Sequence, residues 1–409
     1  MRSFLCQSLL LFFTPLSMAM GLAQEEEDAP RLILMLLNGE ARSLSFEGLN
    51  LRDPRKRGAW SLRVEGFDPP QVASGRQAEV RMHSGEELRG RIVGGEGEML
   101  WIELLGGVRL PLLVESIASL VVPERLAGLK LAPLEPPSEG DRLYRRTQTA
   151  LDVVDGTLDS FRADGVSFES LEVGLKSFAW DEIAALFIEY IDEGGPTSKG
   201  SDSADEVPVV LDLADQSRVR GALLRMSPEH CHVRVGEHEL ALPWRAVSEM
   251  SVVDGRVQFL SELKPLREEG RGVPFDDDLG MSWPHRMDAN AFDGGPLRSG
   301  DRVWRRGIGM HAPSRLTFEL DGSYQRLLGA CAIDDEALKN PRPARGAVLF
   351  RIHLDGKLAF ESSLVRGGDE PLAIPDISLS GKKELVLEVD PAGSHSGDRA
   401  NWLRMILVR

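Results

Sequence analysis

The segment VLDLADQSRVRGALL, at residues 210–224, contains the clearest signal of the fold. Two short runs rich in apolar residues flank a polar stretch, which is typical of two β-strands joined by a turn. The segments VRMHSGEELRGRIV at 80–93 and LDVVDGTLDSF at 151–161 have the same form. These copies recur about every 65 residues, so the sequence predicts a repeated β-unit.

Each hairpin is followed by a further strand pair and by a closing apolar segment. The closing segments are LPLLVESIASLVV, LKSFAWDEIAALFIEY and LALPWRAVSEMSVV. A repeat of this length suits a small curled sheet or barrel, and its turn spacing resembles SH3-like and Sm-like barrels. A shorter, degenerate copy begins at LILMLLNGEARSLSFEG, residues 32–48.

The expected architecture is all-β, with tandem small β-barrel or curled-sheet units followed by a C-terminal β-sandwich. Gly, Ser, Pro and acidic residues dominate 192–206, a composition that cannot order itself by burial and predicts a flexible linker. The predicted segments are a signal peptide at 1–23, a degenerate unit at 31–75, repeat units at 76–131, 141–191 and 207–257, and a sandwich at 258–409.

The N-terminus and the net charge limit the classes of function. Residues 1–23 combine an early arginine, an apolar core and small residues near the end, the layout of a secretory signal peptide. We therefore expect a secreted, periplasmic or cell-envelope protein with no transmembrane segment after cleavage. The net charge of −16 argues against binding to a nucleic-acid backbone.

The last third of the chain contains a series of motifs in a specific order. They are FLSELKPL at 259–266, GGPLRSGDRVWRRGIGMHAPSRLTFEL at 294–320, AIDDEA at 332–337, GAVLFRIHLDGK at 346–357 and GDRANWLRMILV at 397–408. In this order they resemble the NPCBM/NEW2 family, a carbohydrate-binding type of module. The resemblance implies a galactose-binding-like jelly roll, and the short apolar strands separated by turns agree with a two-sheet sandwich.

The resemblance implies a sugar ligand, which would be recognised by an aromatic ring together with planar, charge-assisted hydrogen bonds. We expect the side chains for this task in the loops of the sandwich. The candidate carbohydrate-binding residues are Trp304, Arg305, His311, Asp334, Asp335, Arg366, Asp398 and Trp402.

Several of these residues also have a structural interpretation. His311, in RGIGMHAPS at 306–314, could be a hydrogen-bonded strut of a tight turn that Gly307 and Gly309 permit. Trp402 could belong to the core, and Asp334 and Asp335 could cap a turn through backbone hydrogen bonds.

Cofactors are not clearly indicated, although a structural calcium ion is compatible with the carboxylates of 288–295 and 333–336. His230 and His232 fall on one face of a predicted strand, where they could hold zinc or simply face solvent. No catalytic residues are predicted, because no nucleophile has an evident activating base.

The sequence therefore favours a noncatalytic protein that binds a glycan or a cell-surface polysaccharide. One alternative is an adhesion or envelope-assembly protein whose sandwich has lost sugar binding and docks envelope proteins. A third is a glycoside hydrolase, because the many carboxylates allow an acid and base pair.

Overall fold

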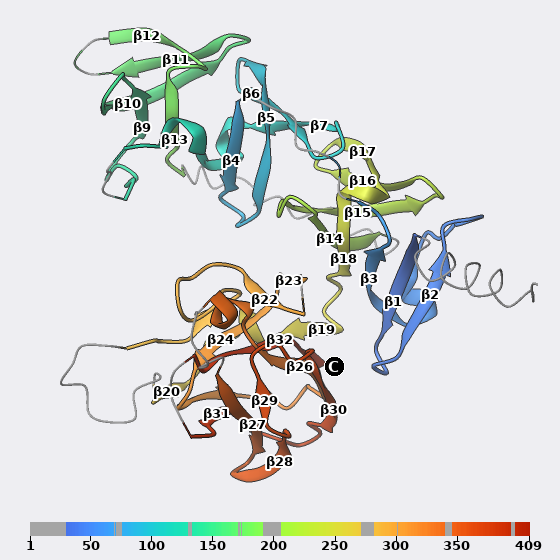
Figure 1. Cartoon of the computed structure of the whole chain (residues 1–409). Helices are drawn as coiled ribbons and strands as arrows, with labels where there is room; N and C mark the ends of the chain where they lie inside the picture. Colours follow the sequence, from blue (N-terminus) through green and yellow to red (C-terminus); the bar gives the residue numbers. More distant parts are fainter. Residues whose placement is uncertain are drawn as a thin grey trace, which may run out of the picture.

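The structure is a computed structural model that describes residues 30–68, 70, 76–129, 133–170, 172, 174–190, 206–270, 282–300, 302–339, 346–393 and 397–409. The predicted signal peptide and all but the last residue of the predicted linker lie outside these ranges. The all-β fold class is confirmed: curled sheets are followed by a two-sheet sandwich (Figure 1). In the described part, no helix has the length and apolar character needed to cross a membrane.

Three units share one strand order, in which the fifth strand returns to pair with the first. The first unit contains β4 (Gln77–Met82), β5 (Glu87–Glu96), β6 (Met99–Leu104), β7 (Arg109–Leu113) and β8 (Ile117–Val121). The second contains β9 (Asp141–Arg146), β10 (Leu151–Phe161), β11 (Gly165–Ser170), β12 (Gly174–Ala179) and β13 (Ile183–Phe187). The third contains β14 (Val207–Leu213), β15 (Arg218–Met226), β16 (His230–Val235), β17 (His238–Pro243) and β18 (Val247–Val252).

The second strand of each unit carries the bend that curls the sheet. The pairing of β5 with β6, of β10 with β11 and of β15 with β16 shifts register within the second strand in every unit. A bulge of this kind increases the local twist of a strand and turns the sheet. In the first and third units, a one-turn 3₁₀ helix leads into the fifth strand.

The N-terminal unit, residues 31–65, is a shortened relative of the others. Its strands β1 (Arg31–Leu36), β2 (Ala41–Ser45) and β3 (Ala59–Glu65) pair in the order β2-β1-β3, and the 3₁₀ helix η1 (Pro54–Arg57) precedes β3. These correspond to the first, second and fifth strands of a full unit, without the third and fourth.

The units join in pairs through their fifth strands. Strand β8 pairs antiparallel with β13, which makes a ten-stranded sheet from the first and second units. Strand β3 pairs in the same way with β18, which makes an eight-stranded sheet from the N-terminal and third units. Segments far apart in the sequence therefore lie side by side (Figure 1).

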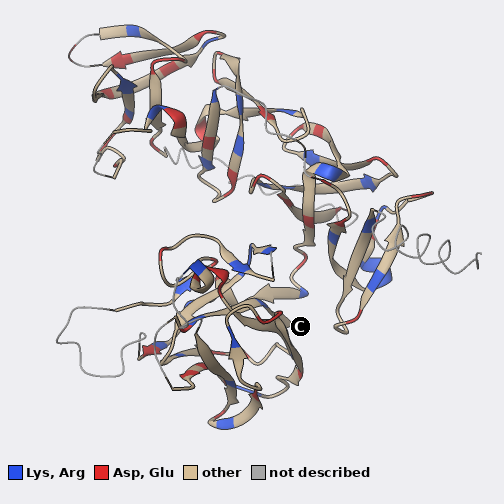
Figure 2. Ribbon diagram, viewed as in Figure 1, with Lys and Arg blue, Asp and Glu red and all other residues tan. Residues whose placement is uncertain are grey.

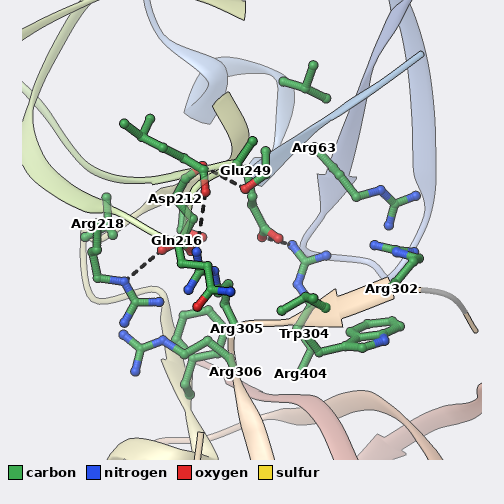
Figure 3. A pocket seen from close by; sticks show the side chains of 18 of the residues that line it. Arg63, Asp212, Gln216, Arg218, Glu249, Arg302, Trp304, Arg305, Arg306 and Arg404 are labelled. Carbon is green, nitrogen blue, oxygen red and sulfur yellow. Dashed lines mark hydrogen bonds and ion pairs between the residues drawn. The ribbon is translucent and has the colours of Figure 1, made fainter. Parts of the chain in front are cut away.

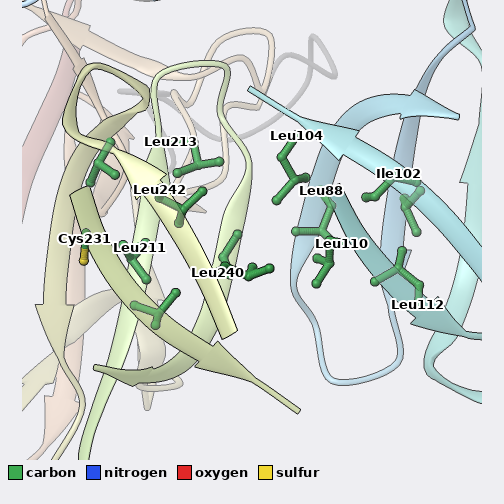
Figure 4. Close-up of a cluster of buried hydrophobic side chains, with 14 of the residues drawn as sticks. Leu88, Ile102, Leu104, Leu110, Leu112, Leu211, Leu213, Cys231, Leu240 and Leu242 are labelled. Atoms are coloured by element: carbon green, nitrogen blue, oxygen red, sulfur yellow. The ribbon is translucent and has the colours of Figure 1, made fainter. Parts of the chain in front are cut away.

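The first and third units also pack against each other, and their leucine-rich cores face across this contact (Figure 4). The turn after β6 approaches so closely that a Cβ on Gly106 would lie 2.8 Å from the ring of Pro243. The Arg89 amide donates a 2.8 Å hydrogen bond to the Ser217 hydroxyl across the same contact. The repeat units therefore form one continuous body.

The sandwich follows from β19 (Val257–Phe259) onward. One sheet has the order β21 (Arg286–Met287), β24 (Gly307–His311), β32 (Arg399–Val408), β26 (Arg326–Ile333) and β30 (Leu372–Ser378), with β19 also on β32. The other has the order β20 (Arg267–Glu269), β25 (Ser314–Glu319), β31 (Glu384–Pro391), β27 (Ala347–Leu354) and β28 (Lys357–Glu361), with β29 (Val365–Arg366) on β27. A small hairpin, β22 (Leu297–Ser299) and β23 (Arg302–Trp304), lies outside both sheets.

The two glycines of RGIGMHAPS have a different role from the one predicted. Gly307 and Gly309 lie in strand β24 rather than in a turn, and neither has a positive φ. A Cβ on Gly309 would lie 2.3 Å from the Ala289 carbonyl oxygen, and one on Gly307 would lie 2.5 Å from that of Trp402. The glycines are needed because other backbone segments approach the strand closely.

The sandwich packs on the N-terminal unit through an apolar cluster and several hydrogen bonds. Trp60 of β3 contacts Phe259, with ring centroids 6.0 Å apart, and both are buried together with Ile406 and Val408. The Arg326 guanidinium donates to the carbonyl oxygens of residues 37 and 38 at 2.6 and 2.9 Å. The sandwich therefore packs directly against the shortened N-terminal unit.

Candidate functional site

A cleft of about 500 Å³ lies between the sandwich and the repeat units. Figure 3 shows side chains reaching into it from both parts: Arg63, Asp212, Arg218 and Glu249 from the repeat units, and Arg302, Trp304, Arg305, Arg306 and Arg404 from the sandwich. Its volume falls within the range of about 300–1,000 Å³ found for ligand pockets. The cleft is therefore large enough to hold a ligand, and both parts of the chain contribute to it.

The sandwich contributes Trp304 as an aromatic wall. The ring is held in place because its indole Nε1 donates a 3.1 Å hydrogen bond to the Ser299 carbonyl oxygen across the β22–β23 hairpin. The Arg302 guanidinium carbon lies 4.6 Å from the ring centroid, in cation–π contact. The side chain is half-buried, so part of the ring remains accessible.

The repeat units contribute arginine and carboxylate pairs. Arg218 Nε lies 2.8 Å from an Asp212 oxygen, and the two residues are direct partners in the register of β14 and β15. On β3, an Arg63 nitrogen lies 2.6 Å from a Glu65 oxygen. Burial works against ionisation of Glu65, but Arg63 and Arg31 together outweigh this effect and hold the pKa of Glu65 below its usual range.

Arg404 connects the two walls of the cleft. Its guanidinium pairs with Glu249 of β18, donates a 2.6 Å hydrogen bond to the Ser61 hydroxyl, and lies 4.5 Å from the ring centroid of Trp60. Burial lowers the pKa of Arg404, opposed by the charge of Glu249. Together these contacts join the sandwich to the N-terminal and third units at the same time.

The backbone is irregular around the cleft. Among the described residues, five that are not glycine have positive φ, and three of these, Gln216, Asp288 and Arg404, line the cleft or the cavity beside it. The φ of Arg404 is +49° in the middle of β32, where the pairing with β26 shifts register. This bulge directs the side chain out of the sheet toward Glu249.

Two of the predicted site residues, Trp304 and Arg305, lie in the cleft. They also line an adjacent cavity of about 500 Å³ that extends toward the β4–β5 turn. The Arg305 guanidinium donates a 3.4 Å hydrogen bond to the Leu213 carbonyl oxygen of the third unit. The sandwich therefore presents these neighbouring residues to the repeat units.

Four of the predicted residues, His311, Asp334, Asp398 and Trp402, are buried within the sandwich, each with 5% or less of its surface exposed. The Trp402 ring packs edge-on against Phe350 with centroids 4.9 Å apart, so it is a core residue rather than a sugar platform.

The polar members of this group bond to nearby backbone or stack on a neighbour. His311 Nδ1 lies 3.0 Å from the Ala312 carbonyl oxygen, and the imidazole stacks on Trp283 with ring centroids 4.7 Å apart. Asp334 accepts hydrogen bonds from the amides of Arg298 and Glu336 at 3.0 and 2.9 Å. These contacts tie His311 and Asp334 to neighbouring backbone and to Trp283 inside the sandwich.

The remaining predicted residues, Asp335 and Arg366, lie away from the cleft walls. Asp335 begins the 3₁₀ helix η6 (Asp335–Lys339) and is half-buried. Arg366 is exposed at the end of β29, and its amide donates a 2.8 Å hydrogen bond to an Asp369 oxygen, which closes a turn. The predicted site residues therefore do not converge on one surface.

Metal-binding geometry is absent from the described part of the chain, where no three His, Cys, Asp or Glu residues are grouped to hold an ion. His230 and His232 share a face of β16, with ring centroids 6.1 Å apart. The carboxylate of Asp293 accepts hydrogen bonds from Asn290 and from the Gly295 amide, both at 2.8 Å, within its own loop.

Sequence reasoning missed the repeat-unit wall of the cleft, including Arg63, Asp212, Arg218 and Glu249. The only local signal was the occurrence of Arg218 and Arg220 two residues apart, which puts both on one face of a strand. Which face meets the sandwich depends on how the domains pack, and the strand pattern alone does not determine that.

The two stacked antiparallel sheets, beside which the β22–β23 hairpin carries Trp304, form a carbohydrate-binding-module-like domain. Residues 256–408 match the NPCBM/NEW2 domain family, which confirms the resemblance for the C-terminal third of the chain. No curated protein sequence matches the chain.

Two solved structures illustrate what the chain is similar to. The CBM51 module from Clostridium perfringens GH95, in complex with methyl-galactose, is 22% identical, with coverage of 37% of this chain and 99% of that one and a TM-score of 0.31. The tandem CBM51 modules of Sp3GH98, the family 98 glycoside hydrolase from Streptococcus pneumoniae, are 9% identical. The match covers 92% of this chain and 88% of that one, also with a TM-score of 0.31.

Proposed function

We propose that this protein is a secreted or periplasmic, noncatalytic protein that binds carbohydrate in the cleft between its sandwich and its repeat units. The family match supports a sugar ligand, and the signal-peptide pattern supports export. The observation that carries the proposal is the accessible Trp304 ring beside several guanidinium groups in a cavity of about 500 Å³.

The cleft has the chemistry that sugar recognition requires. A pyranose ring has a weakly apolar face that packs on an aromatic ring, while its hydroxyl groups accept hydrogen bonds from planar guanidinium groups. Trp304 supplies the ring, and Arg302 and Arg305, its close neighbours in sequence, supply donors. Asp212 and Glu249 supply acceptors for hydroxyl protons on the opposite wall.

The ion pairing of the cleft supports a noncatalytic role. Glycoside hydrolysis needs a carboxylic acid that keeps its proton and a second carboxylate across the scissile bond. The four carboxylates of the cleft each form an ion pair with an arginine: Glu65 with Arg63, Asp212 with Arg218, Glu249 with Arg404, and Glu262 with Arg306. Carboxylates that are each held by a guanidinium do not form the facing carboxyl pair that this reaction uses.

The proposal is tested with the full mature chain on a glycan array, followed by isothermal titration with the best-bound oligosaccharide. We expect saturable binding, and the Trp304→Ala variant should bind about tenfold more weakly or worse, because the sugar loses its stacking surface.

Trp101→Ala is the matched control. Trp101 is a 39% exposed tryptophan on β6 of the first unit, outside the cleft, and its substitution should leave the affinity unchanged. No saturable binding to any glycan would reject the proposal. If Trp304→Ala and Trp101→Ala lost the same amount of affinity for the oligosaccharide, the cleft would be rejected as the binding site.

A further inference from the structure

The cleft carries an excess of positive charge that its own carboxylates do not neutralise. Seven arginines and four acidic residues line it, a difference of three positive charges, whereas the whole chain has a net charge of −16. Elsewhere acidic and basic residues are interspersed along the strands (Figure 2). The cleft is therefore a local exception to the charge of the molecule.

Two of the arginines account for much of this excess. Among the described residues, no carboxylate lies within ion-pair distance of Arg302 or Arg305. Arg302 contacts the Trp304 ring, and Arg305 donates only a 3.4 Å hydrogen bond to a carbonyl oxygen. Within the described ranges, opposite charges act on these two guanidinium groups only from beyond ion-pair distance.

Arg302 is exposed and Arg305 is half-buried, and neighbouring arginines add positive charge around both. Partial desolvation of its guanidinium, reinforced by the charges of Arg63 and Arg404 and opposed by those of Glu65 and Glu249, lowers the pKa of Arg302 from its ordinary value. Burial also lowers the pKa of Arg305, with Asp212 opposing the effect and Arg218 adding to it. A bound anion would relieve this cost, because it would supply the missing opposite charge.

We propose that the ligand of the cleft is an acidic carbohydrate, whose carboxylate or sulfate groups bind Arg302 and Arg305 while a sugar ring packs beside Trp304. This inference rests on the proposed function and deepens it by naming the ligand class. A planar guanidinium binds a carboxylate or sulfate through two parallel hydrogen bonds. Since Arg302 lies over one face of the Trp304 ring, an acidic group held by Arg302 places its sugar next to that ring.

The test compares chemically matched oligosaccharides on the full mature chain by isothermal titration. The probes are a tetramer of galacturonic acid, the methyl ester of that tetramer, a heparin-derived tetrasaccharide and inorganic sulfate. We expect an acidic oligosaccharide to bind at least about tenfold more tightly than the neutral methyl ester, with an advantage that falls as salt rises from about 50 to about 500 mM.

The variants Arg302→Gln and Arg305→Gln should each remove most of the preference for the acidic probe. Neither variant should lower the thermal unfolding midpoint, because each removes a charge that has no carboxylate partner in the described structure. Arg109→Gln is the control: Arg109 is 61% exposed on β7, outside the cleft, and its loss should not affect binding.

The outcomes separate this inference from the proposed function. If the neutral ester binds as tightly as the acid, the ligand class is wrong and carbohydrate binding stands. If no saccharide of either kind binds, both proposals fail. If inorganic sulfate displaces the tetramer at equal concentration, the cleft is a simple anion site. Tighter binding of the heparin fragment than of the galacturonate would identify sulfate as the preferred group.

Discussion

Arg404 shows how one residue can join parts of the chain that are remote in sequence. It is separated by 343 positions from Ser61, to which it donates a hydrogen bond, and by 155 from Glu249. Its side chain is 11% exposed, and that of Glu249 is 20% exposed. A largely buried ion pair adds little net stability as a whole, but the loss of one partner leaves the other charge uncompensated.

We therefore expect Arg404→Ala to lower the free energy of unfolding by about 3 kcal/mol, as measured by urea denaturation of the full chain. The double variant Arg404→Ala/Glu249→Ala should be more stable than the single one, because it removes the orphaned carboxylate. Arg81→Ala, which breaks the exposed pair with Glu87, should lower the free energy of unfolding by less than about 1 kcal/mol. A cost for Arg404→Ala no larger than that of the control would contradict the predicted role of the pair.

At the scale of single elements, β31 carries a row of charges across the outer face of its sheet. Glu388 lies 2.9 Å from His353 Nε2, 3.0 Å from Arg351 and 3.1 Å from Arg315, residues of the two flanking strands. Burial works against ionisation of Glu388, but these partners outweigh it, so its pKa lies below the ordinary value of 4.5. Opposite charges on adjacent strands thus support the register of three strands.

This network predicts a pH-dependent contribution to stability. Because the pKa of Glu388 is lower in the folded state, its contribution is present above the ordinary pKa and disappears as the pH falls through the folded-state pKa. In urea unfolding experiments, Glu388→Gln should lower the free energy of unfolding by about 1 kcal/mol near pH 7 and by almost nothing near pH 2. The exposed Glu319→Gln on β25 should show no such difference, and a cost that is the same at both pH values would refute the mechanism.

For the whole molecule, the position of the sandwich depends on the shortened N-terminal unit. That unit lacks the third and fourth strands of a full repeat, and the sandwich packs against it through Trp60, which is 3% exposed. Apolar contacts of this kind hold two domains in a fixed relation, whereas a polar interface would allow relative motion. The cleft exists only while this contact holds.

We expect Trp60→Ala to loosen the attachment of the sandwich, because truncation of a buried tryptophan removes about 3 kcal/mol or more of packing. Small-angle scattering should then show a larger radius of gyration, and glycan binding should weaken although Trp60 is outside the cleft lining. Trp101→Ala should leave the scattering profile unchanged. An unchanged radius of gyration for Trp60→Ala would show that this cluster does not position the sandwich.

The sequence alone was sufficient to predict the β-class, the repetition of the units and the NPCBM-like sandwich. The NPCBM-like sandwich was predicted from the resemblance of its motifs, in their order, to that family. The β-class and the repetition depend on local signals, namely apolar alternation with period two and turn residues between strands, which act over a few residues. Trp304 and Arg305 were identified for the same reason, since both lie in a polar loop-like stretch between predicted strands. The burial of His311, Asp334 and Asp398 was not evident, because a polar residue next to a turn can point inward or outward.

Only the tertiary structure decided how the fifth strands of the units pair, which arginines face the sandwich and where the cleft lies. Arg63, Arg218 and Arg404 come from three distant segments, and each looks like an ordinary solvent-facing strand residue in the sequence. Their convergence depends on the pairing of β3 with β18 and on the packing of Trp60 against Phe259. Such contacts depend on surface complementarity between folded units, which no local pattern of residues encodes.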